Sequence, residues 1–428
     1  MLSLIHQAVL FAPGPFPTTF PDSGTYLSWH PQRTPLYPLI LSLFGSIHFT
    51  ALFQVVVFAL AVVVFHLALR LILQTMLKTS TNAFSLFLWG GSLYFATNFE
   101  LVQFSPTILT ESLGISFFLF YFLTILAFRA SSPGLTQKIL LILSFLVFPI
   151  VLFFLRPSFI LVPIATSIFL ILEIFFRNFT QNATFKSTRT VLLALLCLVL
   201  YSGSIVGYAF WNRPRLGHVG ISDIAQHQIF ANYMAQGVLL EEAEKPETSP
   251  ELKAFGAANK IINLDPNKRG SQYLLFEQWQ EMNPGKDLYT NLVLVNQELL
   301  SRRFLGYIKA ALRNLSSLID GRASFNYYPI EHRDRPSWLY FWVQFILDNL
   351  FAGLWFVALI YFFMTIAKRP LFGNENLLFV LIASQFLTIA FVGYSELRRQ
   401  SIGVGSIQVI FVMMMWIHLL KRRIPQET

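Results

Sequence analysis

Nine long apolar runs recur along this chain, and they constrain its fold more than any other feature of the sequence. The runs cover residues 48–73, 83–99, 109–128, 139–155, 157–176, 190–211, 338–366, 376–394 and 402–420. A helix needs roughly 17 to 25 apolar residues to cross the hydrocarbon core of a bilayer. Lipid offers backbone polar groups no hydrogen-bond partner, and the alternating pattern of a barrel strand is absent. The runs are therefore predicted to be membrane-spanning helices.

The composition agrees with this interpretation. Hydrophobic residues make up 55% of the 428 residues, charged residues make up 12%, and the mean hydropathy is +0.57. The formal charge of +9 does not indicate nucleic-acid binding, because the long polar stretch at 212–336 holds 15 Lys and Arg against 14 Asp and Glu. We predict an all-α polytopic membrane protein with about nine to ten transmembrane helices, a helical external domain and no nucleic-acid partner.

The basic residues of the short loops predict which side of the membrane is cytoplasmic. If the spans alternate in direction, one side collects Arg70, Lys78, Arg129, Lys138, Arg177, Lys186, Arg189, Lys368, Arg369, Lys421, Arg422 and Arg423. By the positive-inside rule this side is cytoplasmic, and so is the C-terminus. The opening stretch and residues 212–336 then lie outside. The short external loops hold only Arg33, Arg156, Arg398 and Arg399, and topology does not explain these four.

These observations divide the chain into three parts. Residues 1–211 form an N-terminal transmembrane module with a first external loop at 14–47, residues 212–336 form an external helical region, and residues 337–428 form the C-terminal transmembrane helices. Residues 1–13 are either an interfacial piece or the outer end of a helix that begins before the sequence given.

Local patterns predict further helices outside the spans. The prolines of 14–35 rule out a continuous helix there, and 36–47 is predicted to be a short helix at the interface. Ser249 followed by Pro250 predicts a helix start. One apolar face is then expected to run along a single long helix, carried by Leu288, Leu292, Val295, Leu299, Ile308, Leu312, Leu315 and Ile319.

Signatures of soluble enzymes are absent, and a set of external charges stands out instead. There is no phosphate-binding glycine loop, no HExxH, no GxSxG and no cysteine-based metal site, since Cys197 is the single cysteine. The external loops supply the carboxylates Asp22, Glu100 and Glu111 and the guanidiniums Arg33, Arg156, Arg398 and Arg399. A carboxylate in a partly dry site can act as a general base, and the planar fork of arginine suits phosphate.

Simpler interpretations of these charges stay open. Glu111, preceded by Thr110, can cap the start of a helix, where a carboxylate favours the helix dipole. Arg156 can anchor its loop to lipid head groups. The remaining charges can satisfy one another as surface pairs.

Three segments resemble a known family. They are Pro21-Asp22-Ser23-Gly24-Thr25-Tyr26-Leu27, Arg33-Thr34-Pro35-Leu36-Tyr37-Pro38-Leu39 and Pro106-Thr107-Ile108-Leu109-Thr110-Glu111-Ser112-Leu113. Their order and spacing resemble the opening of the GT-C glycosyltransferases of the protein-mannosyltransferase and aminoarabinose-transferase type. Those enzymes have an Asp in the first external loop, an R-x-P-x-Y-P segment after it and a Thr-Glu pair at the head of a later helix.

The resemblance implies an enzyme that transfers a sugar from a polyprenyl-phosphate carrier to an acceptor, with inversion, on the external face of a membrane. The expected location is a bacterial inner membrane with the active site facing the periplasm. The donor would be a polyprenyl-phosphate-linked sugar, and the acceptor a lipid, a glycan or a protein. The implied roles are catalysis by Asp22, as base, and by Glu111, and contact with the carrier phosphate by Arg398 or Arg399. Tyr26, Arg33 and Arg156 are the further candidates for substrate or phosphate binding on the same face. A divalent cation is left open, with Asp22 and Glu100 as its candidate ligands.

Two other functions are compatible with a chain of this kind. A polysaccharide polymerase or O-antigen-ligase-like enzyme also combines many spans with external arginines, but it uses a pyrophosphate-linked donor and does not need the Asp22 and Arg33-x-Pro opening. A lipid or solute transporter is the third candidate. That class predicts inverted repeats and broken helices at matching positions of two halves, and the sequence shows no such symmetry.

Overall fold

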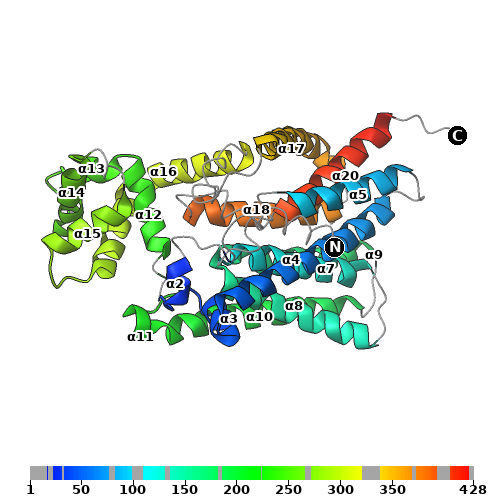
Figure 1. Cartoon of the computed structure of the whole chain (residues 1–428), viewed down its shortest axis with the longest axis horizontal. Helices are drawn as coiled ribbons and strands as arrows, with labels where there is room; N and C mark the ends of the chain where they lie inside the picture. The colour runs from blue at the N-terminus through cyan, green and yellow to red at the C-terminus, as the bar shows by residue number, and fades with distance from the viewer. Residues whose placement is uncertain are drawn as a thin grey trace.

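The computed structural model of the chain describes Pro17 and residues 23–30, 33–76, 82–98, 109–130, 135–181, 186–222, 224–265, 271–320, 338–368, 373–392 and 405–423. Within these residues every regular element is a helix (Figure 1). The first half of the chain forms α2 (Ser23–Leu27), α3 (Leu36–Phe44), α4 (Ile47–Met76), α5 (Asn82–Thr97), α7 (Glu111–Ala130), α8 (Leu135–Leu155), the 3₁₀ turn η1 (Pro157–Phe159), α9 (Leu161–Gln181) and α10 (Lys186–Trp211). The second half forms α11 (Arg213–Leu216), α12 (Ile224–Ala235), α13 (Val238–Ala243), α14 (Pro250–Asn263), α15 (Gln272–Met282), α16 (Leu288–Asp320), α17 (Trp338–Thr365), η4 (Ile366–Lys368), α18 (Asn374–Val392) and α20 (Gly405–Arg423).

Six helices among the described residues are long and apolar enough to cross a membrane: α4, α7, α8, α9 with the preceding η1, α10 and α18. This confirms the prediction of an all-helical integral membrane protein for the described part of the chain. The predicted spans 83–99, 338–366 and 402–420 form the helices α5, α17 and α20. The apolar helices found within α17 and α20 are shorter, Asn349–Thr365 and Gly405–Leu420, and α5 has 16 residues, so the count of nine to ten stays a prediction.

The membrane helices share one hydrophobic core, which also includes α2 and α3. α4 packs against α5 and α7, α7 packs against α8, and α18 packs against α9 and α20. Phe65 of α4 stacks on Phe95 of α5, with ring centroids 4.5 Å apart. Gly91 lets α5 approach α20, because a Cβ atom there would lie 2.5 Å from the Cε atom of Met413. The short helices α2 and α3 belong to the same core, so the bundle itself fixes their position.

Two buried arginine contacts mark the opposite ends of the bundle. Arg129, in the last turn of α7, donates to Glu173 Oε1 of α9 (3.0 Å) and to Asn374 Oδ1 at the start of α18 (2.6 Å). At the other end of α7, Glu111 pairs with Arg156, which directly follows α8. The start of α7 and the last turns of α8 and α18 therefore lie at one end of the bundle, called the site end below.

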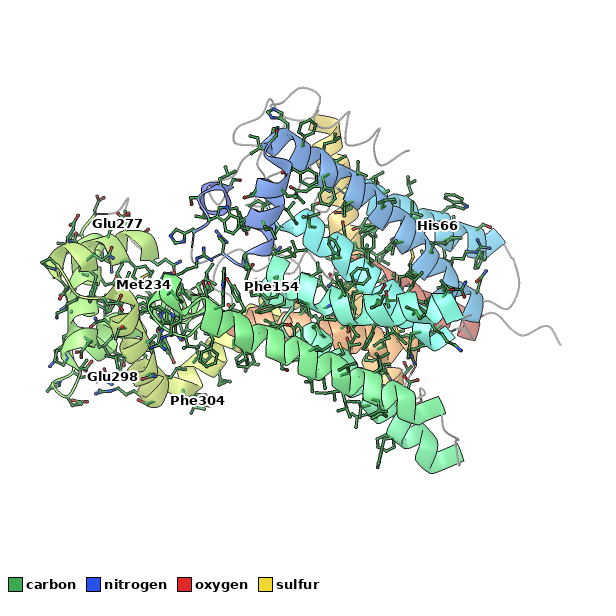
Figure 2. The ribbon with its side chains drawn as sticks, turned by 90° about the horizontal axis from the view of Figure 1, so that it is seen from below. His66, Phe154, Met234, Glu277, Glu298 and Phe304 are labelled. Carbon is green, nitrogen blue, oxygen red and sulfur yellow. The ribbon has the colours of Figure 1, made fainter. Side chains whose placement is uncertain are left out.

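A second core holds together α12 to α15 and the first half of α16, a unit called the lobe below. Phe255 of α14 stacks on Trp279 of α15, with ring centroids 4.9 Å apart. Ser249 caps α14 by accepting a hydrogen bond from the Leu252 N–H, which confirms the predicted helix start. The lobe lies beyond the site end (Figure 1), and Figure 2 shows Phe154 of α8 on the side of the lobe, with His66 of α4 at the far side.

A buried carboxylate ties α13 to α16 inside the lobe. Glu242 accepts hydrogen bonds from Lys245 Nζ (2.6 Å) and from Arg303 Nε. Burial favours a higher pKa for Glu242, but the hydrogen bonds and charges of Lys245 and Arg303 outweigh it and lower the pKa. The carboxylate therefore stays ionised and holds the Arg303 side chain in place.

α16 is kinked where this ion pair holds it, at Arg303, whose φ of −131° and ψ of 35° are not helical. Before the kink the expected apolar face is buried at Leu292, Val295 and Leu299. After it, Leu312 is 59% exposed and Tyr307 is buried instead. The prediction of one apolar face along the whole helix therefore holds only in part, because Leu315 and Ile319 still pack against the core of the bundle but Leu312 does not.

The second half of α16 joins the lobe to the bundle. Asn314 Nδ2 donates to the backbone oxygen of Ala390 (3.2 Å), and the Tyr307 hydroxyl donates to that of Phe391. Both acceptors belong to the last turn of α18, whose final carbonyls have no partner within their own helix. Side chains of α16 thus donate hydrogen bonds to the last carbonyls of α18 at the site end.

Candidate functional site

Arg33 folds the first loop back on itself. Its Nε atom donates to Thr25 Oγ1 (2.8 Å), and its Nη1 atom donates to the Tyr26 hydroxyl (3.4 Å). The guanidinium carbon also lies 4.6 Å from the centroid of the Tyr26 ring, within the range of a cation–π contact. The Arg33 side chain is therefore held against α2, the helix that directly follows Asp22 in the sequence.

Two tyrosines connect this loop to the membrane helices. The rings of Tyr26 and Tyr37 meet edge to face, with centroids 5.0 Å apart. The Tyr37 hydroxyl donates to Gln54 Oε1 (2.7 Å), and Gln54 Nε2 donates to the Leu109 oxygen (3.1 Å). Burial raises the pKa of Tyr37 well above its ordinary value, with smaller contributions from Tyr26 and Glu111, so this hydroxyl remains a donor. The tyrosine of the R-x-P-x-Y-P segment thus fixes the loop to α4 and to the residues before α7.

The start of α7 carries a buried ion pair. Glu111 is 2% exposed, and its Oε1 atom lies 3.5 Å from Arg156 Nη1. The preceding Thr110 shares a hydrogen bond of 3.4 Å between its Oγ1 atom and the Tyr26 hydroxyl. Arg156 reaches Glu111 because α8 ends at Leu155 and the chain becomes extended at Arg156 before η1. Tyr26, Arg33, Glu111 and Arg156 are therefore brought together at the site end.

The remaining predicted site residues, Asp22, Glu100, Arg398 and Arg399, lie outside the described residues. The candidate metal ligands Asp22 and Glu100 are both among them. Among the described residues, no three His, Cys, Asp or Glu side chains lie close enough together to hold a metal ion. The structure thus describes one carboxylate of the predicted site, Glu111.

Two buried glutamines belong to this region and were not singled out from the sequence. Gln54 of α4 and Gln385 of α18 are both fully buried. Gln385 Nε2 donates to Ser158 Oγ (3.3 Å), two residues after Arg156, so α18 supports the loop that carries this arginine. A polar side chain within an apolar span is costly when it faces lipid. That rule, applied to the sequence, could have identified both glutamines.

The cluster is suited to binding an anion. Arg33 and Arg156 bring two guanidiniums to the start of α7, where the backbone N–H groups of a long helix also favour negative charge. Hydrogen bonds connect Arg33 through the Tyr26 hydroxyl to Thr110, the residue before Glu111. Glu111, paired with Arg156, orients this guanidinium. Phosphate is the anion that such planar, charged donors bind well.

Comparisons of the chain with protein-family models, with curated proteins and with solved structures find no match. The function is therefore inferred from the contacts described above and from the sequence motifs.

Proposed function

We propose that this protein is an integral-membrane glycosyltransferase of the GT-C type, which moves a sugar from a polyprenyl-phosphate carrier to an acceptor hydroxyl at the site end of the bundle. One observation carries the proposal. Three segments far apart in the sequence meet at the start of α7. Arg33 and Tyr26 of the first loop reach Thr110 through hydrogen bonds, and the next residue, Glu111, pairs with Arg156 after α8. The first loop and the start of α7 carry the motifs that resemble those of GT-C enzymes.

The proposed reaction is a single displacement at the anomeric carbon. The acceptor oxygen forms the new bond to this carbon while the bond from the carbon to the phosphate oxygen breaks. The polyprenyl phosphate leaves with the bonding electrons, and Asp22 accepts the proton of the acceptor hydroxyl. Attack opposite to the leaving group inverts the anomeric configuration.

The arginines stabilise the charge that develops on the leaving phosphate. Arg33 and Arg156 are fixed by hydrogen bonds and by an ion pair before substrate binds, so little reorganisation is needed during the reaction. Arg398 and Arg399 are assigned to the same task from their sequence position alone. Glu111 acts through Arg156 as a positioning residue.

We propose that the site end faces the exterior, which is the periplasm if the membrane is a bacterial inner membrane. The basic residues of the opposite loops favour this orientation by the positive-inside rule. A carrier lipid whose sugar is exposed at this face would present its phosphate to the arginines of the site end. The acceptor can be a lipid, a glycan or a protein.

The test is sugar transfer by membranes that contain the full chain, supplied with a panel of polyprenyl-phosphate sugars and with native envelope extract as acceptor. Release of polyprenyl phosphate is followed by mass spectrometry. We expect Asp22→Asn to reduce the initial rate at least about a hundredfold, as loss of a general base does. Asp265→Asn in the lobe is the matched control and should keep the full rate.

Full activity of the Asp22→Asn variant would remove Asp22 from the mechanism. Turnover of a polyprenyl-pyrophosphate-linked donor, with the monophosphate-linked donors left intact, would favour the polymerase or ligase alternative instead.

A further inference from the structure

A second group of basic side chains lies beside the candidate site, between the first loop and α11. Arg215 of α11 donates from Nη2 to the backbone oxygen of Trp29 (2.6 Å), across 186 positions of sequence. Trp29 has a φ of 53°, in the left-handed region that residues other than glycine rarely adopt. In Figure 1, α11 and α2 lie next to each other at the site end. The loop after α2 is therefore held in an unusual conformation against α11.

This contact brings three basic groups together. His30 directly follows Trp29, and its backbone oxygen accepts a hydrogen bond from the Arg33 N–H (2.9 Å). Burial lowers the pKa of His30, and the charges of Arg33 and Arg215 lower it further. The charges of Arg33 and Arg215 have the same sign and both act on His30, and such charges repel each other. Such an arrangement is stabilised when an anion binds among them.

Arg215 has unused capacity to bind that anion. Its Nη1 atom is buried and makes no hydrogen bond in the part of the chain that the structure describes. The contacts of its guanidinium there are the Trp29 oxygen and the face of the Trp211 ring, whose centroid lies 5.7 Å from the guanidinium carbon. A buried donor without an acceptor costs about 1–3 kcal/mol. A phosphate oxygen would satisfy it.

Two tryptophans beside these basic groups indicate the level of the membrane at which the groups lie. Trp211 is the last residue of the spanning helix α10 and is 58% exposed, and Trp29 is 38% exposed. Exposed tryptophans at the end of a membrane helix favour the level of the lipid head groups. The anions available at this level are the phosphates of lipids.

We propose that Arg215 and His30, beside Arg33, form a second anion subsite that binds the phosphate group of a lipid head group. The subsite is distinct from the Glu111–Arg156 pair, and Arg33 lies between the two. It would hold a phosphate-bearing lipid next to the candidate site. The proposal does not depend on sugar transfer, and its test needs neither donor nor acceptor sugar.

The experiment uses the purified full chain in nanodiscs of phosphatidylcholine. One arm adds phosphatidic acid to the lipid, and the other adds inorganic phosphate to the buffer. Bound phosphatidic acid is measured by native mass spectrometry, and bound phosphate by the rise in melting temperature. The test variant is Arg215→Gln. The matched control is Arg213→Gln, which removes the same charge from an exposed position of the same helix.

We expect Arg215→Gln to weaken binding of phosphatidic acid about tenfold or more, as loss of a charge-assisted pair does, and Arg213→Gln to bind as the wild type does. Dependence on Arg215 in the phosphatidic acid arm alone identifies a lipid site. The same dependence with inorganic phosphate identifies a site for the free anion as well. Equal binding by Arg215→Gln and Arg213→Gln in both arms would overturn the proposal.

The Arg215→Gln variant also loses the hydrogen bond to Trp29, so its fold needs a separate check. Melting temperatures of all variants are compared without added ligand. Arg215→Lys keeps the charge and should recover part of the binding to phosphatidic acid. A lysine variant that melts like the wild type and binds no better than the glutamine variant would count against a phosphate at this position.

Discussion

At the scale of single residues, two buried carboxylates mark the opposite ends of α7. Glu111 pairs with Arg156 at the site end, and Glu173 pairs with Arg129 at the other end. Both carboxylates are nearly inaccessible, at 2% and 5% exposure. Removing one partner of such a pair leaves a buried charge uncompensated. Each pair buries a carboxylate against an arginine, and the distance between the two groups is 3.0 Å for Glu173 and 3.5 Å for Glu111.

This likeness gives a test of the role of Glu111. Glu111→Gln and Glu173→Gln should each destabilise the protein by about 3 kcal/mol, since each leaves an arginine without its carboxylate. Only Glu111→Gln should also lower the rate of sugar transfer, by about tenfold or more, because Arg156 is no longer held toward the phosphate. Melting temperature and initial rate are measured on the same membranes. Equal loss of rate in both variants would show that Glu111 is merely structural.

The sequence singled out the charged residues of the cluster but not its neutral ones. Arg33 and Arg156 could be selected because they oppose the positive-inside rule, and Glu111 because a carboxylate at the start of a span is costly. Gln54 and Gln385 carry no charge and give no topological signal. That they meet Tyr37 and Ser158 depends on how α4 and α18 pack, which no single segment of sequence contains.

At the scale of elements, local sequence signals predicted where helices form but not where a helix bends. The cap at Ser249 and the short helix predicted over 36–47, which is α3, are confirmed, because each depends on neighbouring residues only. The kink of α16 lies at Arg303, whose side chain meets Glu242 of α13. That contact spans 61 positions of sequence, so periodicity alone predicted a straight helix instead.

The lobe contains a histidine whose burial makes its stability depend on pH. Burial lowers the pKa of His227 to about 4. In the unfolded chain the imidazole takes up a proton below about pH 6.5, so between these values the unfolded state binds more protons than the folded one. The free energy of unfolding therefore decreases as the pH falls through this window, by at most about 3 kcal/mol. Glu242 contributes only below its ordinary pKa of 4.5.

His227→Phe should remove most of this dependence. Phenylalanine keeps the ring contact with Phe276, whose centroid lies 4.8 Å from that of the imidazole. Hydrogen exchange of the α12 amides reports unfolding of the lobe in the full-length protein between pH 7 and pH 4. The prediction fails if the variant loses protection with the same slope as the wild type.

At the scale of the whole molecule, hydropathy predicted the helical architecture because the bilayer allows few alternatives to helices. Six helices long and apolar enough to span a membrane are found in the described residues. The lobe could be anticipated as helical, but not its attachment to α18 by Tyr307 and Asn314. Side chains so far from α18 in the sequence meet it only in the folded protein.

The orientation of the molecule in the membrane can be tested by labelling introduced cysteines, because the sequence contains a single native cysteine. Cys197 is 1% exposed, so an introduced cysteine can be labelled selectively. We expect a membrane-impermeant maleimide to label Leu264→Cys, at an 84% exposed position of the lobe, in intact cells. Lys138→Cys, at the start of α8, should react only after the cells are permeabilised. The opposite pattern would place the lobe in the cytoplasm.

The attachment of α16 to α18 also bears on the order in which the protein is made. Asn314 and Tyr307 leave the ribosome before Ala390 and Phe391, whose carbonyls they bind. The lobe can therefore fold while α17 and α18 are still being synthesised. When α18 enters the membrane, acceptors at its last turn find donors that are already in place. The polar end of a membrane helix is then satisfied during biosynthesis by a part of the chain made earlier.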